Sequence, residues 1–418
     1  MELIQEYNYD HQLTDESKLI IEELQKFNKS FLKLTPDISN KMSEFFKEMY
    51  DNILEAKRDF KKQYKSHLYL HDITSAKQIP KPDSFHSHFF PNKIIEHINT
   101  NSTRYLTYDY KLGKRTVSIK IVFMDIADTN VDFYNYYVEI IYIITHILNN
   151  YSSLECGKNL ELYIYLTDFK KKIPNSNLEE FDTKHVNTAY SDVCTSNSQI
   201  VLYRSEEWVK VLIHELFHNY GLDFSKIKYN NLKNKIKDIF PIKSDFELTE
   251  SYAEFFGEVI NISLTTFYLD ESTSISLYVK NCHYLLFYEQ LFSLFQCVKI
   301  LYKIGLSYEN LYLKDEVSKS LRDNIYYREK TNVFCYYVVK NILLFNYEDF
   351  IKLCSEKNLQ LLDFRKTETM LNHFYNFIKS KHNDKKLINI IRKIEKNLNN
   401  VSNNLLKKTA RISCIELK

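Results

Sequence analysis

The strongest chemical signal in the sequence is the pattern His-Glu-x-x-His formed by His214, Glu215 and His218. On a helix, side chains four residues apart project from the same face, so both imidazoles can reach one zinc ion at about 2.1 Å. Glu215 lies one step round the helix, where it can take a proton from a water in the open coordination position. The pattern predicts a zinc site with two histidine ligands and Glu215 as general base. Two hydrogen-bonded histidines on a helix face are the alternative.

The residues around this pattern predict a helix that contains it. Ser205 is a candidate N-cap, and the acidic Glu206 and Glu207 suit the positive end of a helix dipole. Gly221 is expected to end the helix in a left-handed conformation. One class of zinc sites continues the pattern as H-x-x-G-x-x-H, but Phe224 stands at its last position and Asp223 is one residue out of step. A third ligand is therefore expected from another segment.

A row of carboxylates offers that ligand on the next predicted helix. We expect Ser244 and Glu247 to form a capping box that starts the helix. Glutamates then follow at steps of three and four residues, on one face of a helix with apolar flanks: Glu247, Glu250, Glu254 and Glu258. In gluzincin metallopeptidases, which this part of the chain resembles, a Glu from a second helix completes the zinc site and an acid follows four residues later. By that resemblance we expect Glu250 to be the third ligand and Glu254 to accept the free ring N–H of a ligand histidine, fixing its tautomer. A solvated acidic face is the alternative.

The pair His214-Glu-Leu-Phe-His218 and Glu250-Ser-Tyr-Ala-Glu254 resembles the H-E-x-x-H plus E-x-x-x-D/E signature of gluzincin metallopeptidases. In composition and motif context, the chain also looks similar to uncharacterised metallopeptidases of large DNA viruses. The resemblance implies a zincin-like core, a Zn²⁺ cofactor and a protein or peptide substrate. It also implies an edge strand, here Val186–Tyr190, that pairs with an extended substrate. Family members stabilise the oxyanion with a Tyr or His, for which the candidates are Tyr190, Tyr229, His283 and Tyr312.

The elements that must position these residues indicate an α+β fold. Helical periodicity from about residue 15 to 64 is followed by a loop at Lys77–Asn92. Two alternating runs around Gly113 predict a hairpin, and a helix and several short strands precede the zinc helix. These elements are expected at Arg104–Leu112, Arg115–Phe123, Val131–Asn149, Leu160–Leu166 and Gln199–Tyr203. We expect a mainly helical part at 1–100, a zincin-like α/β part with a small mixed sheet at 101–225, and a helical part at 226–418 with the third ligand and a basic tail.

The composition and the apolar runs limit which partners and which location are expected. The net charge of +2 is too small to attract the whole molecule to nucleic acid. The lysine-rich last forty or so residues are a weak candidate for nucleic-acid binding, and a solvated helical face is the simpler interpretation of these lysines. The apolar runs Tyr134–Leu148 and Cys282–Ile304 contain polar residues and indicate buried helices without membrane insertion. The N-terminus lacks the features of a signal peptide. The seven scattered cysteines favour reduced thiols. An intracellular, cytoplasmic protein is expected, with virion association left open.

Three hypotheses of function follow. The first is an active zinc metallopeptidase of gluzincin type. The second is a zincin-like zinc-binding module that serves interaction or structure without cleaving, against which the intact Glu215 argues. The third is a helical protein without a metal.

Overall fold

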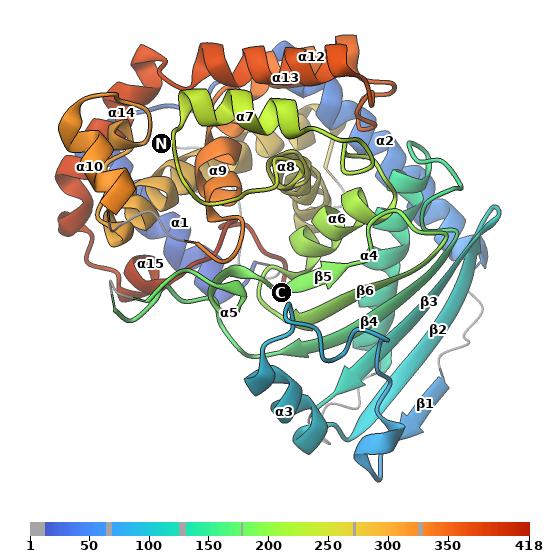
Figure 1. Ribbon diagram of the computed structural model, residues 1–418. Helices are drawn as coiled ribbons and strands as arrows, with labels where there is room; N and C mark the ends of the chain where they lie inside the picture. The colour runs from blue at the N-terminus through green and yellow to red at the C-terminus, as the bar shows by residue number, and fades with distance from the viewer. Residues whose placement is uncertain (1–12, 64–68, 125–130, 177–178, 271–272, 325–328) are drawn as a thin grey trace.

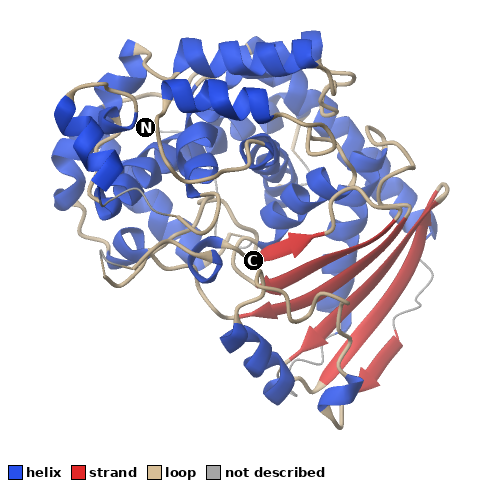
Figure 2. Ribbon diagram, in the orientation of Figure 1, coloured by secondary structure: helices blue, strands red, loops and turns tan. Residues whose placement is uncertain are grey.

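In the part of the chain that the structure describes, six strands form one mixed sheet (Figures 1 and 2). The computed structural model describes residues 13–63, 69–124, 131–176, 179–270, 273–324 and 329–418. The strands are β1 (Tyr69–Asp72), β2 (Arg104–Leu112), β3 (Arg115–Phe123), β4 (Asn159–Thr167), β5 (Ala189–Ser191) and β6 (Asn197–Arg204), in the order β1-β2-β3-β4-β6-β5. β3, β4 and β6 run parallel, and the outer strands at both edges are antiparallel to their neighbours. The fold is α+β, as predicted.

The two faces of the sheet bury different residues because side chains alternate along each strand. One face, with Ile121, Ile164 and Leu202, packs into the main hydrophobic core together with α4 (Val131–Asn149) and α6 (Trp208–Asn219). The opposite face, with Tyr165 and Tyr203, packs against α3 (Asn92–Asn101) and the loop before it. The hairpin and α4 have the bounds that alternation and periodicity predicted.

Helices make up most of the rest of the described chain. The N-terminal part contains α1 (Asp15–Phe27), a π-helix (Asn28–Leu32) and α2 (Asn40–Gln63). The remaining helices are α5 (Thr183–Val186), α7 (Asn230–Ile239), α8 (Thr249–Leu269), α9 (Ile275–Ile304), α10 (Glu316–Asn324), the π-helix η5 (Phe334–Val339), α11 (Lys340–Phe345), α12 (Tyr347–Lys357), α13 (Glu368–Lys381), α14 (Lys385–Asn397) and α15 (Asn404–Lys408). Short 3₁₀ turns lie at Ala76–Gln78, Glu309–Leu311 and Leu398–Asn400.

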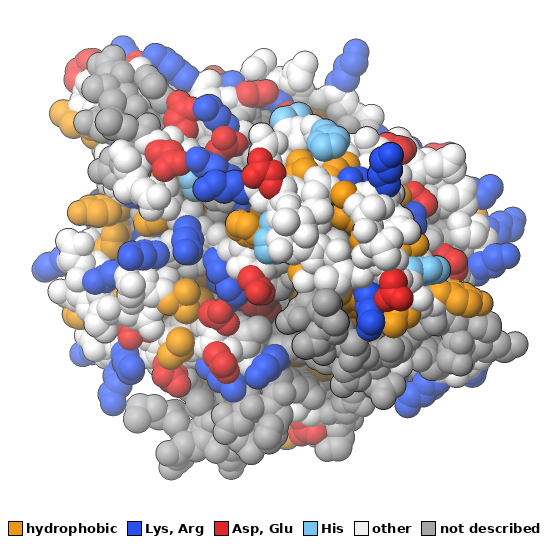
Figure 3. Space-filling view, turned by 90° about the horizontal axis from the view of Figure 1, so that it is seen from below, with side chains coloured by type: hydrophobic (Ala, Val, Ile, Leu, Met, Phe, Trp, Pro, Cys, Tyr) orange, Lys and Arg blue, Asp and Glu red, His pale blue; other side chains and the backbone are white. Residues whose placement is uncertain are grey.

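The apolar runs expected to be buried are buried. They form α4 and α9 inside the core, and among the described residues no helix is both long and apolar enough to cross a lipid bilayer. The lysines of α13 and α14 lie mostly on the surface, whereas the chain after α15 runs buried through the core to Leu417. On the face shown in Figure 3, acidic and basic side chains are intermixed.

Candidate metal centre

The helix α6 carries His214, Glu215 and His218, and it begins later than the sequence suggested. Ser205 does not cap it: the Ser205 hydroxyl donates to the carbonyl of Thr167 at 3.2 Å. The capping position is Glu207, which adopts a left-handed conformation with φ 61°. The correction has a physical cause, because Glu207 is buried and bound from distant parts of the chain. Its carboxylate pairs with Lys171 at 2.7 Å and accepts backbone N–H groups of Ile412 and Ser413 at 3.0 and 2.6 Å.

The other end of α6 is as predicted. Gly221 has φ +64°, and the Leu222 N–H donates to the Phe217 carbonyl at 2.9 Å while the Gly221 N–H donates to the His218 carbonyl at 3.2 Å. This pair of bonds is the Schellman motif that ends many helices at glycine. The turn directs the chain back along the last helical turn and so brings Asp223 beside His218.

The helix α8 supplies the carboxylates, again with a corrected start. It begins at Thr249, so the expected capping box does not form and Glu247 lies outside the helical row. The Ser244 hydroxyl instead donates to Glu329 at 3.1 Å, and the Glu247 N–H donates to the side chain of Asn332 at 2.9 Å. These partners come from the segment before η5, which local spacing could not reveal.

The three predicted ligands converge. The Nε2 atoms of His214 and His218 lie 3.1 Å apart, and Oε2 of Glu250 lies 3.1 Å from the first and 3.5 Å from the second. Ligand atoms about 2.0–2.1 Å from a tetrahedral zinc ion are separated by about 3.3 Å, so this triangle has the size of one face of a zinc tetrahedron. Among the described residues, these three form the group of His, Cys, Asp and Glu side chains able to hold a metal ion.

Carboxylates contact the far ring nitrogen of each histidine. Nδ1 of His214 lies 3.2 Å from Oε1 of Glu254, the residue predicted for this role. Nδ1 of His218 lies 2.5 Å from Oδ2 of Asp223, which is fully buried. Such partners fix the tautomer and orientation of ligand histidines. Asp223 was missed in this role: its sequence signal was an acidic residue directly after the helix-ending turn, considered only as a metal ligand.

A buried lysine completes the charge arrangement. Nζ of Lys210 lies 2.7 and 3.0 Å from the two carboxylate oxygens of Glu254. Burial alone would lower the pKa of His214, but Glu254 and Glu250 raise it to about 8. Burial alone would also lower the pKa of His218. The carboxylates of Glu250 and Asp223 outweigh this effect and raise the pKa well above its ordinary value. The histidines and lysine hold the pKa of Glu250 and Glu254 well below the ordinary value despite burial.

His214, His218 and Glu250 line a cleft of about 630 Å³ between the sheet edge and the helical part. Glu215 faces this cleft, and its Oε2 accepts the hydroxyl of Ser191 at 2.6 Å. Ser191 belongs to β5, which is shorter than the predicted strand Val186–Tyr190. Val186 instead ends the short helix α5, because the side chain of Asp182 caps it by accepting the Thr183 N–H at 2.7 Å.

Two of the four candidates for oxyanion stabilisation line the cleft, and two lie outside it. Tyr190 and Tyr229 line the cleft, but the first donates its hydroxyl to the Ser84 carbonyl at 2.9 Å and the second to Glu247. His283 lies outside the cleft, with Nε2 2.8 Å from the hydroxyl of Ser43 on α2. Tyr312 also lies outside it and packs its ring against Tyr308 and His382. The structure therefore removes His283 and Tyr312 from the site.

Tyr336 on η5 lines the cleft instead, and sequence reasoning missed it. Its ring centroid lies 6.2 Å from that of His214. Burial raises the pKa of its hydroxyl well above the ordinary value, and the nearby carboxylate of Glu250 adds to the effect, so the group stays a protonated donor. No local pattern marks this residue among the 33 tyrosines of the chain.

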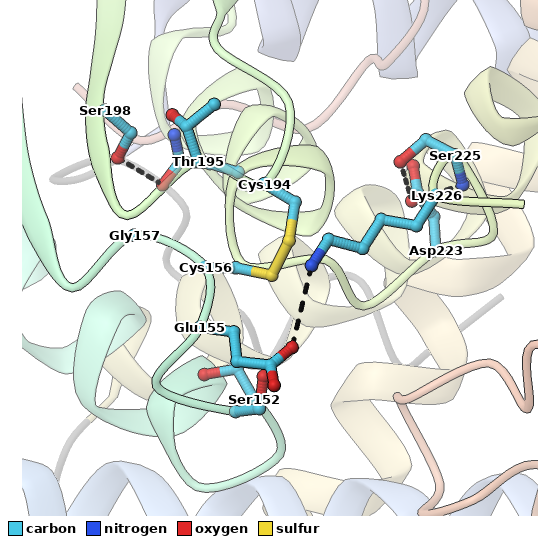
Figure 4. Close-up of a disulfide and its surroundings, with 12 residues drawn as sticks. Ser152, Glu155, Cys156, Gly157, Cys194, Thr195, Ser198, Asp223, Ser225 and Lys226 are labelled. Carbon is cyan, nitrogen blue, oxygen red and sulfur yellow. Dashed lines mark hydrogen bonds and ion pairs between the residues drawn. A yellow bond between two sulfur atoms is a disulfide. The ribbon is translucent and has the colours of Figure 1, made fainter.

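A disulfide corrects the expectation of seven reduced thiols. Cys156 and Cys194 are bonded, and they join the loop before β4 to the loop between β5 and β6 (Figure 4). The bond lies on the turn that ends α6, where a Cβ added to Gly221 would meet both sulfur atoms at less than 3.0 Å. The Cys194 N–H donates to the carbonyl of His218 at 3.2 Å. The remaining five cysteines are free and buried. Spacing could not reveal the pair, because 38 positions separate its members.

Comparison of the chain with protein-family models, with curated proteins and with solved structures found no match.

Proposed function

We propose that this protein is a zinc-dependent peptidase of the gluzincin type, with His214, His218 and Glu250 as ligands and Glu215 as general base. The observation that carries the proposal is the triangle of donor atoms, with sides of 3.1, 3.1 and 3.5 Å. Two imidazoles and one carboxylate, with a position left for water, are the donor set of catalytic zinc sites. Structural zinc sites usually fill all four positions with protein ligands, which favours a catalytic role.

The charges around the triangle support a divalent ion. Three carboxylates, Glu250, Glu254 and Asp223, contact the two imidazoles, and one buried ammonium group, Lys210, pairs with Glu254. Two further positive charges balance this set. They can come from protons on both histidines or from one divalent cation with both histidines neutral, so a zinc ion can replace two protons without leaving buried charge unpaired.

The reaction would use the metal ion and four side chains. A bound zinc ion would polarise the scissile carbonyl and lower the pKa of the attacking water. Glu215, fixed by the hydroxyl of Ser191, takes the proton of that water and returns it to the leaving amine. Tyr336, which lines the cleft and whose hydroxyl lies beside the carboxylate of Glu250, would donate a hydrogen bond to the developing oxyanion. Glu254 and Asp223 hold the two imidazoles in the ligand tautomer.

A peptide substrate is favoured by the outer edge of β5, with which no strand of the described residues pairs. The Tyr203 N–H donates to the Thr188 carbonyl, and the Asp192 N–H donates to the Gln199 carbonyl, so residues 188, 190 and 192 direct their backbone groups toward β6. By alternation, the backbone groups of Ala189 and Ser191 point away from β6. Both residues line the cleft. An extended peptide can therefore add as a further antiparallel strand beside the general base.

The Glu215→Gln variant tests the proposed reaction. In the zinc-loaded protein, we expect hydrolysis of a mixed peptide library to fall by about 10²–10⁴ while the zinc content stays unchanged. Glu247→Gln, which changes another carboxylate of the same cleft, is the matched control and should retain most of the activity. Equal hydrolysis by Glu215→Gln and wild type would refute the assigned base.

A zinc-binding module without activity is the second candidate function. It is favoured only if wild-type protein binds zinc through the same three ligands and cleaves no peptide. The carboxylate of Glu215 in the cleft argues against it, because a site that only binds zinc has no need of a general base.

A further inference from the structure

The cleft contains an exposed aromatic side chain that neither the metal site nor the core uses. Phe89 lies in the loop between β1 and α3 and is 42% exposed, yet it lines the cleft beside β5. Its neighbour Phe90 does the packing: it is 2% exposed and stacks on Tyr203 with a centroid distance of 4.9 Å. The ring of Phe89 is therefore not required to fill the core.

Hydrogen bonds anchor the backbone of this loop to the sheet. The Tyr203 hydroxyl donates to the backbone carbonyl of Phe89 at 3.2 Å, and the Tyr190 hydroxyl donates to the carbonyl of Ser84 at 2.9 Å. The loop is thus tied to β5 and β6 on the sheet face opposite the metal site. Because the ring of Phe89 lies in the cleft beside β5, a ligand bound there would cover it and gain the free energy of removing apolar surface from water.

The register of β5 identifies what would meet this ring. Tyr190 points to the face that carries Phe89, with ring centroids 6.3 Å apart, whereas Ser191 points to the other face and reaches Glu215. A peptide strand paired with β5 would alternate in the same way. Its residue opposite Tyr190 would form a non-hydrogen-bonded pair, in which side chains lie closest, and would project its side chain toward Phe89.

We propose that Phe89 and Tyr190 form a specificity subsite for a large apolar or aromatic side chain at the substrate position opposite Tyr190. The inference rests on the proposed peptidase function and adds the substrate class. The preferred substrates are extended segments in which this residue points away from the metal and the two residues beside it point toward the metal side of the sheet.

The test uses zinc-loaded, full-length protein and internally quenched peptides of an alanine-rich host, in which each position in turn carries Phe, Leu, Lys or Glu. Cleavage sites are assigned by mass spectrometry. We expect one position, at a fixed distance from the cleaved bond, to favour Phe or Leu over Ala about tenfold in kcat/KM. Phe89→Ala should abolish that preference, and Phe89→Leu should keep part of it.

The matched control is Leu359→Ala, which removes another exposed apolar side chain outside the cleft and should leave the preference intact. The subsite would be overturned if the preference survives in Phe89→Ala, or if wild type hydrolyses all peptides equally whichever position carries the apolar residue. Either result would be compatible with the peptidase function. Zinc-loaded wild type that cleaves none of the peptides would instead overturn the proposed function, and the subsite with it.

Discussion

Replacing Asp223 by Asn should weaken zinc binding although Asp223 is not a ligand. Oδ2 of Asp223 lies 2.5 Å from Nδ1 of His218, and Oδ1 accepts both the N–H and the hydroxyl of Ser225 at 3.0 and 2.6 Å. An asparagine has only one acceptor oxygen, so its NH₂ group must face a donor on one of the two sides. The substitution also removes the charge that makes His218 a more basic ligand.

The magnitude follows from these contacts. Loss of a carboxylate partner of a metal-bound histidine typically costs 10- to 100-fold in metal affinity, which is about 1.4–2.7 kcal/mol. Competition with a zinc chelator at fixed pH measures the change directly. Asp245→Asn is the matched control, because Asp245 lines the same cleft, is 77% exposed and contacts neither histidine. An Asp223→Asn affinity equal to that of wild type, or an equal loss in both variants, would refute the role of Asp223.

Three further predictions concern the donor, the disulfide and the histidines. Tyr336→Phe should lower kcat about 100-fold, with KM and zinc content nearly unchanged, because it removes one donor to the oxyanion; an unchanged kcat in steady-state assays would exclude that role. The Cys156→Ser/Cys194→Ser double variant should lose about 4 kcal/mol of unfolding free energy in non-reducing urea titrations, since the bonded residues are 38 positions apart. Adding reductant to wild type should cause an equal loss. An unfolding free energy that changes in neither experiment would contradict the bond. In the metal-free protein, burial lowers the pKa of His214, but Glu254 outweighs this effect and raises the pKa from 6.5 to about 8. Up to about 2 kcal/mol of unfolding free energy should therefore be present below pH 6.5 and lost as the pH rises through 8. Unfolding titrations at a series of pH values should show this slope in wild type and a weaker one in Glu254→Gln.

The parts of the fold that follow from local pattern were predictable. The hairpin strands β2 and β3 and the helix α4 have the bounds given by alternation and helical periodicity, and Gly221 ends α6 with the expected positive φ. His214 and His218 were identified from spacing, Glu250 was identified from the row of glutamates together with the resemblance to gluzincins, and the structure brings the three donor atoms together. The strands, the helices and the histidine pair depend on neighbours within a few residues or on the geometry of a single helix, whereas Glu250 lies on a second helix.

The features that depended on distant partners were not predictable. Glu207 caps α6 because the chain near Ser413 binds its carboxylate, more than 200 positions away in sequence. Thr249 begins α8 because Glu247 is held by Asn332, from a segment that no periodicity connects to it. Tyr336 reaches the cleft from a π-helix far along the chain. In each case, tertiary contacts outweighed the local preference for a cap or left no local signal at all.

The most direct test of the central claim is the metal content of purified protein, measured by elemental mass spectrometry for wild type beside His218→Ala and Glu250→Ala. We predict about one zinc ion per chain in wild type and loss of that zinc in both variants, because each variant removes a corner of the donor triangle. The folded state of both variants is checked by circular dichroism. Wild-type protein without zinc or another divalent metal after reconstitution, or full zinc retention in a folded Glu250→Ala variant, would contradict the central claim.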